Sequence, residues 1–285
     1  MKKVFECLAW ILIAAGIGLA VFKAGKKPDT VRMEWSRTIM DGSRTGVKPV
    51  TVENIEAALG TFDGGTYVAP NGRCFESGTT PQVARLMMDV QPRLKDLKEV
   101  IGYCTEDMKA KGPESGLSNM MVDAMRAEGE RIFKKPMDLA LSNFGGIRTS
   151  FPQGPLILDD VLSMFPFKNY LVFAQVRGSE LRKLFTQFAE SGFQCLSGVR
   201  IVAKDHKLVS VEIGGKPLDD KKLYNMTTID FLLGGGDHIA IGAMAENLVL
   251  SDVLIKDYMI RYIKAQTAAG KNIEYAKDGR IIIEE

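Results

Sequence analysis

The chain has 285 residues, of which 46% are hydrophobic and 25% are charged, a composition ordinary for a folded protein of one large domain or two small ones. Its formal net charge of +2 predicts no general affinity for nucleic acid. No stripe of Lys and Arg lies beside aromatic residues, so a nucleic-acid polymer is excluded as the expected partner.

Residues 1–27 form an expected targeting segment. Two lysines precede an apolar run over residues 7–22, and three lysines follow it. As a helix this run would span ~24 Å, short of the roughly 30 Å hydrocarbon core of a bilayer. A signal peptide, with Gly18-Leu19-Ala20 as its cleavage candidate, and a retained membrane anchor both fit. A buried core helix is a third interpretation. The first two predict an exported protein, periplasmic or anchored to the membrane outside the cytoplasm.

Residues 28–80 are polar and rich in turn residues, so we expect an irregular lead segment with one short helix over residues 52–59. A second helix is predicted from Thr80 as N-cap and Pro81 as first residue. Pro92 should interrupt this helix. Its apolar face is then expected to continue at three positions: Leu94, Leu97 and Ile101.

The rest of the chain, residues 81–285, predicts one mixed α/β (α+β) domain. One helix carries Leu117, Met121, Ala124 and Met125 at helical spacing. A second helix follows Gly178 and has an apolar face made of Leu181, Leu184, Phe185 and Phe188. A third helix is expected over residues 252–266. Strands are expected over residues 138–141, 170–176, 199–203, 208–213, 224–228 and 280–283. A tight turn at Asp205-His206 should join two of these strands as an antiparallel pair.

Three cysteines follow the targeting segment: Cys74, Cys104 and Cys195. Their number is odd and no C-x-x-C occurs, so neither a disulfide framework nor a zinc site is indicated. One bridge with one free thiol stays open for an oxidising compartment. Buried thiols are expected at Cys104 and Cys195.

One short stretch combines two glycines with an amide and a guanidinium group: Asn143-Phe144-Gly145-Gly146-Ile147-Arg148. The glycines let the backbone approach a ligand closely, and the guanidinium suits a phosphate or a carboxylate. Residues 137–142 predict a buried strand, so the stretch lies at the carboxyl end of a strand, where open α/β sheets bind ligands. A turn with a surface arginine is the alternative.

A second glycine turn, Gly234-Gly235-Gly236, precedes Asp237, whose carboxylate could accept hydrogen bonds from both hydroxyls of a ribose. Phe167 and Phe231 offer two flat apolar surfaces that could enclose a base. Core packing is the alternative for each ring alone.

In this order and spacing, residues 100–285 resemble the C-terminal domain of the 5′-nucleotidase / UDP-sugar hydrolase family. The matching motifs are Val100-Ile101-Gly102, Glu114-Ser115-x-x-Ser118-Asn119-x-x-x-Asp123-Ala124-Met125, residues 143–148, Pro166-Phe167, Val176-Arg177-Gly178-x-x-Leu181, Ser197-Gly198-Val199-Arg200, residues 231–237 and Asp278-Gly279-Arg280-Ile281. The resemblance implies a mixed sheet with flanking helices that binds a nucleotide.

The resemblance also implies roles for individual residues. The base-stacking pair matches Phe167 and Phe231, and the ribose-binding carboxylate matches Asp237. The residues on the phosphate side match Arg148 and Asn143, with Gly145 and Gly146 between them. The family usually has a further arginine before the Glu-Ser-x-x-x-Asn segment, where this chain has Lys111 or Lys109. Lys111 fits the spacing best, and a lysine keeps the charge but loses the bidentate fork.

Family members are two-domain hydrolases whose N-terminal domain holds a pair of metal ions that generate and orient the attacking hydroxide. This chain has two histidines, His206 and His238, and contains no D-x-H, N-H-[DE] or H-x-H motif. We therefore expect no catalytic residue, metal or cofactor in this chain, with the divalent metal pair confined to a partner metallophosphatase. His206 is expected in a polar turn, and His238 beside the second glycine turn.

Three hypotheses for function follow from the resemblance. The chain could be the substrate-binding half of a split nucleotide phosphohydrolase, active in nucleotide catabolism with a separate metallophosphatase chain. It could instead be a stand-alone exported protein that binds nucleosides or nucleotides without catalysis. The third hypothesis is a structural protein whose pocket no longer binds a ligand. The presence of five matching side chains argues against it: Asn143, Arg148, Phe167, Phe231 and Asp237. The base, the sugar and the phosphate count are not set by the sequence.

Overall fold

The computed structural model describes residues 54–284. The expected targeting segment over residues 1–27, and the expected lead segment up to residue 53, lie outside the described residues. Among residues 54–284, no helix is both long and apolar enough to cross a membrane.

Residues 54–98 hold the predicted short helix, and further short regular elements where the sequence predicted an irregular segment up to residue 80. These elements are α2 (Ile55–Leu59), β1 (Thr61–Asp63), β2 (Thr66–Val68), β3 (Cys74–Phe75), α3 (Thr79–Val90) and the 3-10 turns η3 (Gln91–Leu94) and η4 (Asp96–Lys98). The three strands form an antiparallel sheet in the order β1-β2-β3. Tyr67 fastens it, because its ring lies between Phe62 and Phe75 and its hydroxyl donates to the carbonyl of Leu59. Strands this short show no alternation in the sequence, which is why they were missed.

The predicted helix after residue 80 is confirmed with corrected ends. α3 begins at Thr79 after Gly78, one residue before the expected cap, and ends at Val90. Pro92 then lies in the 3-10 turn η3, as expected for a residue that interrupts a helix. The continued apolar face was wrong: Ile101 belongs to strand β4 (Val100–Cys104), which pairs with β6 (Gly154–Ile157). The partner strand lies about 50 residues further along the chain, beyond the reach of a local pattern.

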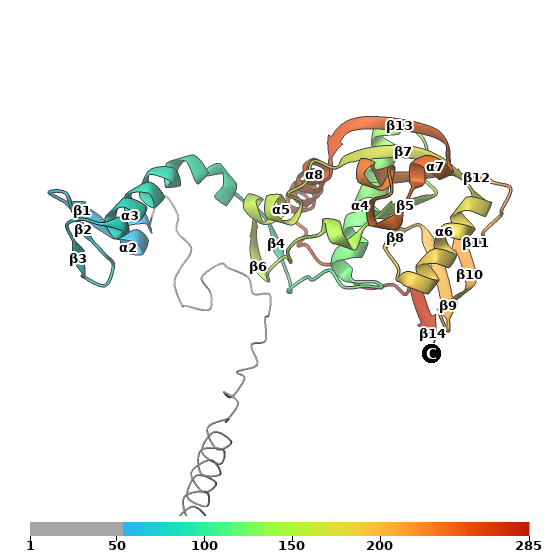
Figure 1. The fold of residues 1–285 in the computed structure, drawn as a ribbon, viewed down its shortest axis with the longest axis horizontal. Coiled ribbons are helices and arrows are strands. Elements are labelled where there is room, and N and C mark those ends of the chain that lie inside the picture. Colours follow the sequence, from blue (N-terminus) through green and yellow to red (C-terminus); the bar gives the residue numbers. More distant parts are fainter. Residues whose placement is uncertain (1–53, 285) are drawn as a thin grey trace, which may run out of the picture. The chain divides into compact units, whose positions relative to one another are not determined.

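A five-stranded sheet carries the rest of the domain, and Figure 1 shows its strands side by side. It consists of β5 (Leu139–Ser142), β7 (Tyr170–Arg177), β8 (Cys195–Ser197), β12 (Leu223–Ile229) and β13 (Ala245–Leu254), in the order β13-β7-β12-β5-β8. β12 and β5 pair in parallel, with Met226 opposite Leu139, and the other pairs are antiparallel. The parallel pair decides where the site forms, because β5 and β12 end at the same edge of the sheet.

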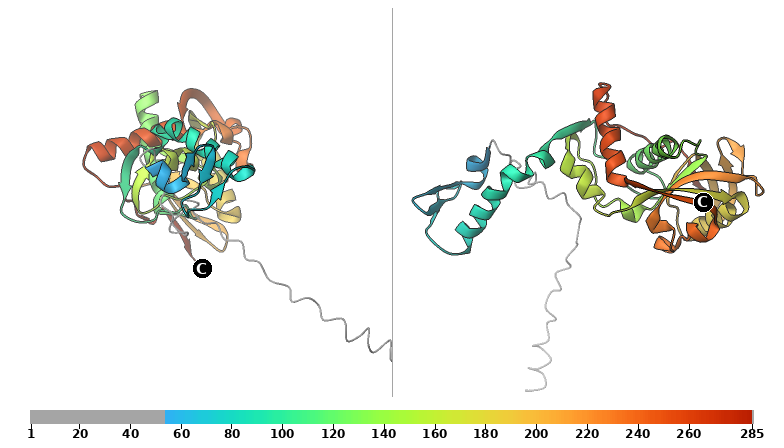
Figure 2. Two further views of the ribbon diagram at one scale, coloured as in Figure 1. Left: turned by 90° about the vertical axis from the view of Figure 1, so that its left-hand side faces the viewer. Right: turned by 90° about the horizontal axis from the view of Figure 1, so that it is seen from above.

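A four-stranded sheet in the order β11-β10-β9-β14 stands beside it. Its strands are β9 (Val199–Lys204), β10 (Lys207–Ile213), β11 (Lys216–Pro217) and β14 (Ile281–Glu284), which leads to the end marked C in Figure 2. β9 and β10 form the predicted antiparallel pair. The turn between them is the predicted one, with φ of 47° at Asp205 and 60° at His206, values that suit a tight hairpin.

Five helices of the described chain follow residue 100: α4 (Gly116–Phe133), α5 (Leu158–Met164), α6 (Gly178–Ser191), α7 (Ile241–Met244) and α8 (Ile255–Ala268). α4 packs across β5, β8 and β12, whereas α6 contacts both β7 and β10 and so joins the two sheets. The predicted apolar faces of α4 and α6 are buried. The start of the third predicted helix was wrong, because Asp252 lies in β13 and α8 begins at Ile255.

The predicted mixed α/β fold is confirmed by this arrangement of sheets and helices. Cys104 and Cys195 are free and buried, as predicted, and Cys74 is free and exposed. Burial, aided by the negative charge of Asp160, raises the pKa of the Cys104 thiol to about 11. These two thiols therefore act as apolar core groups rather than as nucleophiles.

Candidate functional site

The first glycine turn follows β5 directly. Phe144–Gly146 form a 3-10 turn, η5, with Asn143 as its N-cap. The Gly146 amide donates to the Asn143 carbonyl, and the Phe144 amide donates to Oε1 of Gln194 at 3.0 Å. Asn143 is 4% exposed, so its amide group is held inside the turn rather than at the surface.

The second glycine turn follows β12, the parallel neighbour of β5, and meets the first turn. It contains the 3-10 turns η6 (Asp230–Leu232) and η7 (Gly236–His238). Nδ2 of Asn143 donates to Oδ2 of Asp237 at 2.6 Å. Asp237 and His238 have φ of 50° and 61°, in the left-handed region that few non-glycine residues adopt. A charge-assisted hydrogen bond thus joins residues 94 positions apart at the edge of the sheet.

The Phe167 segment reaches the same edge because β7 runs antiparallel to β12, so β7 begins where β12 ends. Oδ1 of Asp230 accepts from the backbone amides of both Tyr170, at 3.0 Å, and Phe231, at 2.9 Å. The Asp230 carboxylate therefore holds together the chain segments that carry Phe167 and Phe231. Phe167 and Phe231 are 46% and 45% exposed, whereas the nearby Phe165 is buried. The exposed rings oppose the core-packing alternative for these two residues.

Arg148 lies between the first turn and Phe167. Its guanidinium donates from Nη1 to the carbonyl of Gly145 at 3.2 Å, and its Cζ lies 5.7 Å from the centre of the Phe167 ring. Its backbone amide donates to the Met164 carbonyl, which fixes the turn against the end of α5. The side chain is exposed, so its remaining donors face solvent.

The glycines at the junction are required by close packing. A Cβ on Gly145 would lie 3.3 Å from Nδ2 of Asn143 and 3.4 Å from Oδ2 of Asp237. A Cβ on Gly146 would lie 2.9 Å from Oδ1 of Asn143, inside van der Waals contact. A Cβ on Gly236 would lie 2.4 Å from the Phe231 carbonyl oxygen and 2.5 Å from its ring.

Asn143 leaves one hydrogen-bonding group unused in the described part of the chain: Oδ1 is buried and accepts no hydrogen bond. A buried acceptor without a donor costs about 1–3 kcal/mol. A donor from a ligand or a water at the junction would remove this cost.

Lys111 lies in the loop before α4, with its side chain exposed. Its backbone amide donates to Oγ of Ser115 at 3.2 Å. The next residue, Gly112, packs against the first turn, since a Cβ there would lie 3.7 Å from the ring of Phe144. The structure thus brings the Lys111 loop beside the turn that carries Asn143 and Arg148.

Sequence reasoning missed three side chains that hold the site together: Asp230, Gln187 and Gln194. Nε2 of Gln187 on α6 donates to the His238 carbonyl at 3.0 Å, so it fastens the second turn as Gln194 fastens the first. Gln187 and Gln194 belong to no motif, and only the folded chain places them here. Asp230 stands next to Phe231 in the sequence, which was the one available signal.

Neither of the two histidines lies in a possible metal site. Within residues 54–284, no group of three or more His, Cys, Asp or Glu side chains could hold a metal ion. His206 occupies the β9–β10 turn, as predicted, and His238 ends the second glycine turn, with its side chain exposed.

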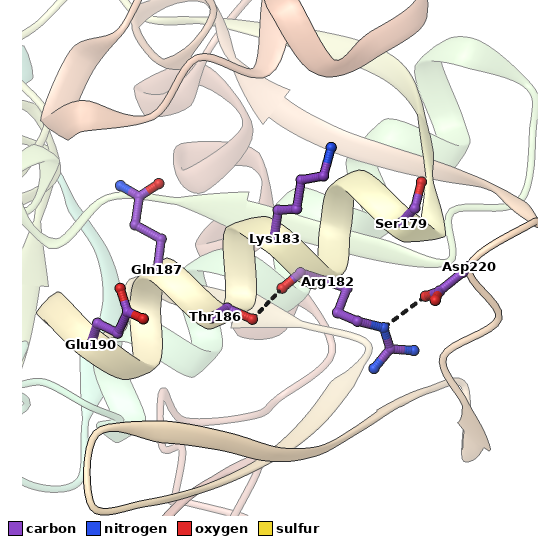
Figure 3. Close-up of a pocket in the computed structure, with 7 residues that line it drawn as sticks. All are labelled: Ser179, Arg182, Lys183, Thr186, Gln187, Glu190 and Asp220. Atoms are coloured by element: carbon purple, nitrogen blue, oxygen red, sulfur yellow. Dashed lines mark hydrogen bonds and ion pairs between the residues drawn. The ribbon is translucent and has the colours of Figure 1, made fainter.

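A shallow hollow of about 450 Å³ lies along one face of α6 (Figure 3). It is lined by Ser179, Arg182, Lys183, Thr186, Gln187, Glu190 and Asp220. Arg182 lies across one end of it, with Nε 2.7 Å from Oδ1 of Asp220. None of the predicted site residues lines this hollow, and its mixed charges favour no ligand class.

Residues 100–244, just over half of the chain, match the family model described as 5′-nucleotidase, C-terminal domain. Protein UshA of Yersinia enterocolitica is 38% identical over 105 residues, which are 35% of this chain and 19% of that protein. A cell wall protein of Listeria monocytogenes is 29% identical over 220 residues, 67% of this chain and 28% of that protein.

Among solved structures, a 5′-nucleotidase precursor from Thermus thermophilus matches with a TM-score of 0.61 and 24% identity, over 78% of this chain and 48% of that one. The chain therefore spans less than half the length of these relatives. The family match covers both glycine turns and the Phe167 segment. The chain belongs to the 5′-nucleotidase C-terminal domain family.

Proposed function

We propose that this chain recognises a nucleoside or nucleotide and is the substrate-binding half of a split nucleotide phosphohydrolase. The observation that carries the proposal is the junction of the two glycine turns, where Asn143 donates to Asp237 at 2.6 Å. Three distant segments meet there with the chemistry that a nucleotide requires: flat rings, a carboxylate and a guanidinium group.

Phe167 and Phe231 would bind the base. Each ring is about half exposed, so each has a face available for stacking. Stacking of one base on aromatic side chains contributes about 1–3 kcal/mol and tolerates different bases. Stacking on these two rings therefore does not by itself select one base.

Asp237 would bind the ribose. Its Oδ2 accepts from Asn143, which fixes the carboxylate and leaves Oδ1 for a sugar hydroxyl. Asp237 itself is exposed, so a sugar can reach it.

Arg148 would face the phosphate, with Asn143 and Lys111 beside it. One guanidinium nitrogen is held by the Gly145 carbonyl, and the other donors remain for an anion. Gly145 and Gly146 leave room for the side chains of Asn143 and Asp237 to pack against the turn beside Arg148.

The hydrolytic chemistry would come from a divalent metal pair on a separate metallophosphatase chain. The proposal is supported by the two histidines of this sequence, too few for such a pair. The metal pair would supply the hydroxide that attacks the phosphorus. This chain would contribute only binding and orientation.

The proposal includes export, with the chain periplasmic or anchored to the membrane by its first 27 residues. The lysine-flanked apolar run supports it, as does a relative described as a cell wall protein. A fragment ending just after Lys27, fused to a reporter that works only after export, tests this part. Reporter activity confined to the cytoplasm would contradict it.

Two assays test the split enzyme. The purified chain should not hydrolyse AMP, UDP-glucose or a chromogenic phosphate ester with manganese, zinc or cobalt. It should co-purify with a metallophosphatase from its own organism, and mixing the two should restore turnover. Turnover by the chain alone after rigorous purification would overturn the division of labour. Nucleotide binding without any such partner would instead make it a stand-alone binding protein.

A further inference from the structure

The Glu-Ser-x-x-Ser-Asn-x-x-x-Asp motif forms hydrogen bonds to the C-terminal segment of the chain. Glu114, which is 6% exposed and lies two residues before α4, accepts three hydrogen bonds on Oε1. The donors are the backbone amides of Asp278, at 2.7 Å, and Gly279, at 3.2 Å, and the side-chain amide of Asn119, at 2.8 Å. The far end of the chain thus donates two of the three hydrogen bonds that this buried carboxylate accepts.

Asp123, further along α4, holds the same segment. The Arg280 guanidinium donates to both of its oxygens, at 2.9 and 2.8 Å, and the Tyr275 hydroxyl donates at 2.5 Å. Burial opposes ionisation, but these hydrogen bonds outweigh it and hold the pKa of Asp123 below its ordinary value. We name Glu114, Asp123, Tyr275 and Arg280 the C-terminal clamp.

The start of α4 also fixes the Lys111 loop. Ser115 caps the helix, and its Oγ accepts from the backbone amides of both Ser118 and Lys111 at 3.2 Å. Glu114 and Ser115 are neighbours in the chain, so the clamp and the loop share one anchor.

The other end of the Lys111 loop is tied to the segment that follows Arg148. Met108 and Phe151 exchange both backbone hydrogen bonds, at 2.9 and 3.0 Å, as an antiparallel bridge. Lys111 follows Met108 by three residues and Arg148 precedes Phe151 by three, so both cations lie on the same side of the bridge. The loop therefore runs from the Arg148 segment to the clamp, with Lys111 between its two anchors.

We propose that the C-terminal clamp positions Lys111 to bind the anionic end of a nucleotide together with Arg148. This inference rests on the proposed function. Glu114 and Arg280 are positioning residues, since they act on the ligand only through the loop. Loss of the clamp should therefore weaken the binding of nucleotides and leave nucleosides unaffected.

A double-mutant cycle on the full chain tests this coupling, with AMP and adenosine as probes and calorimetry as the readout. Lys111→Ala should weaken the binding of AMP about tenfold, as expected for the loss of one hydrogen bond to a charged group. Glu114→Ala should cause a similar loss. The double variant should lose no more than either single variant, because both remove the same contact. Adenosine should bind all three variants as it binds the wild type.

Glu114→Gln is the matched control, because it keeps an acceptor oxygen for the Asp278 and Gly279 amides, and it should bind AMP nearly as the wild type does. If Glu114→Ala does not fold, as judged by thermal unfolding, Tyr275→Phe carries the same test, since it removes only the hydroxyl that reaches Asp123.

Equal losses of affinity for AMP and adenosine would mean that the clamp only stabilises the fold, and would overturn the proposal. Additive losses in the double variant, or a Lys111→Ala variant with unchanged AMP affinity, would also overturn it while leaving the proposed function intact. If the wild-type chain binds neither AMP nor adenosine, UMP and uridine replace them as probes, and a chain that binds none of the four would overturn the proposed function itself.

Discussion

Gly236→Ala should displace Phe231, one of the two rings proposed to bind the base, without removing the ring. The added Cβ would lie 2.4 Å from the Phe231 carbonyl oxygen and 2.5 and 2.7 Å from two atoms of its ring. These distances are well inside van der Waals contact, so the ring or its backbone must move. Gly236 does not have the positive φ that strains an alanine, so the change acts through the position of Phe231.

The size of the effect follows from the stacking energy of a base. If the displaced ring loses its stacking, binding weakens by about 1–3 kcal/mol. This loss corresponds to roughly fivefold to 150-fold in the dissociation constant. Phe231→Ala sets the upper limit, because it removes the ring altogether and should weaken binding by at least about tenfold.

Gly234→Ala is the matched control, because a Cβ there meets nothing within 4 Å. Calorimetry should show that Gly234→Ala binds both ligands with wild-type affinity. Gly236→Ala should lose affinity for adenosine and for AMP to the same extent, since both ligands contain the base. Wild-type affinity in Gly236→Ala, or an equal loss in Gly234→Ala, would refute the assignment of Phe231 to the base.

Three further changes probe other parts of the molecule. Arg148→Ala should weaken AMP more than adenosine, because only AMP offers the guanidinium an anion; equal losses in calorimetry would make the arginine structural. Asp237→Ala should weaken adenosine but spare any affinity for free adenine, and titration with both separates the two effects. Asp123→Asn should destabilise the fold in a pH-dependent way, because Arg280 and Tyr275 lower the pKa of Asp123 below 3.8 in the folded state. A lowered folded pKa gives stability that is present above about pH 4 and is lost as the pH falls through the folded pKa. The stability gap between wild type and Asp123→Asn in urea unfolding should therefore be largest at neutral pH and shrink below about pH 4; a gap that does not change with pH would contradict this account.

Elements with a strong period were predictable from the sequence. The face of α6 carrying Leu181, Leu184, Phe185 and Phe188 is buried as expected. β7 was also found, because residues 170–174 form a continuous apolar run in a buried sheet. β13 was missed because it is an edge strand whose side chains are largely exposed on both faces, so no alternation marks it.

The residue types of the candidate site were visible in the sequence, but the reason they meet was not. Asn143 and Asp237 come together because β5 and β12 are parallel neighbours, a long-range pairing with no local signal. The same holds for Asp230, whose carboxylate fastens the segments of Phe167 and Phe231. The role of Glu114 in holding the C-terminal segment was likewise hidden, because its partners lie 164 and 165 residues away.

Calorimetric titration of the wild-type full chain with adenosine, AMP, uridine and UMP tests the central claim most directly. The account predicts saturable binding of at least one of them at a single site, and Phe231→Ala should weaken that binding about tenfold or more. No binding of any of the four at millimolar concentration would contradict the claim that the two glycine turns form a nucleotide site.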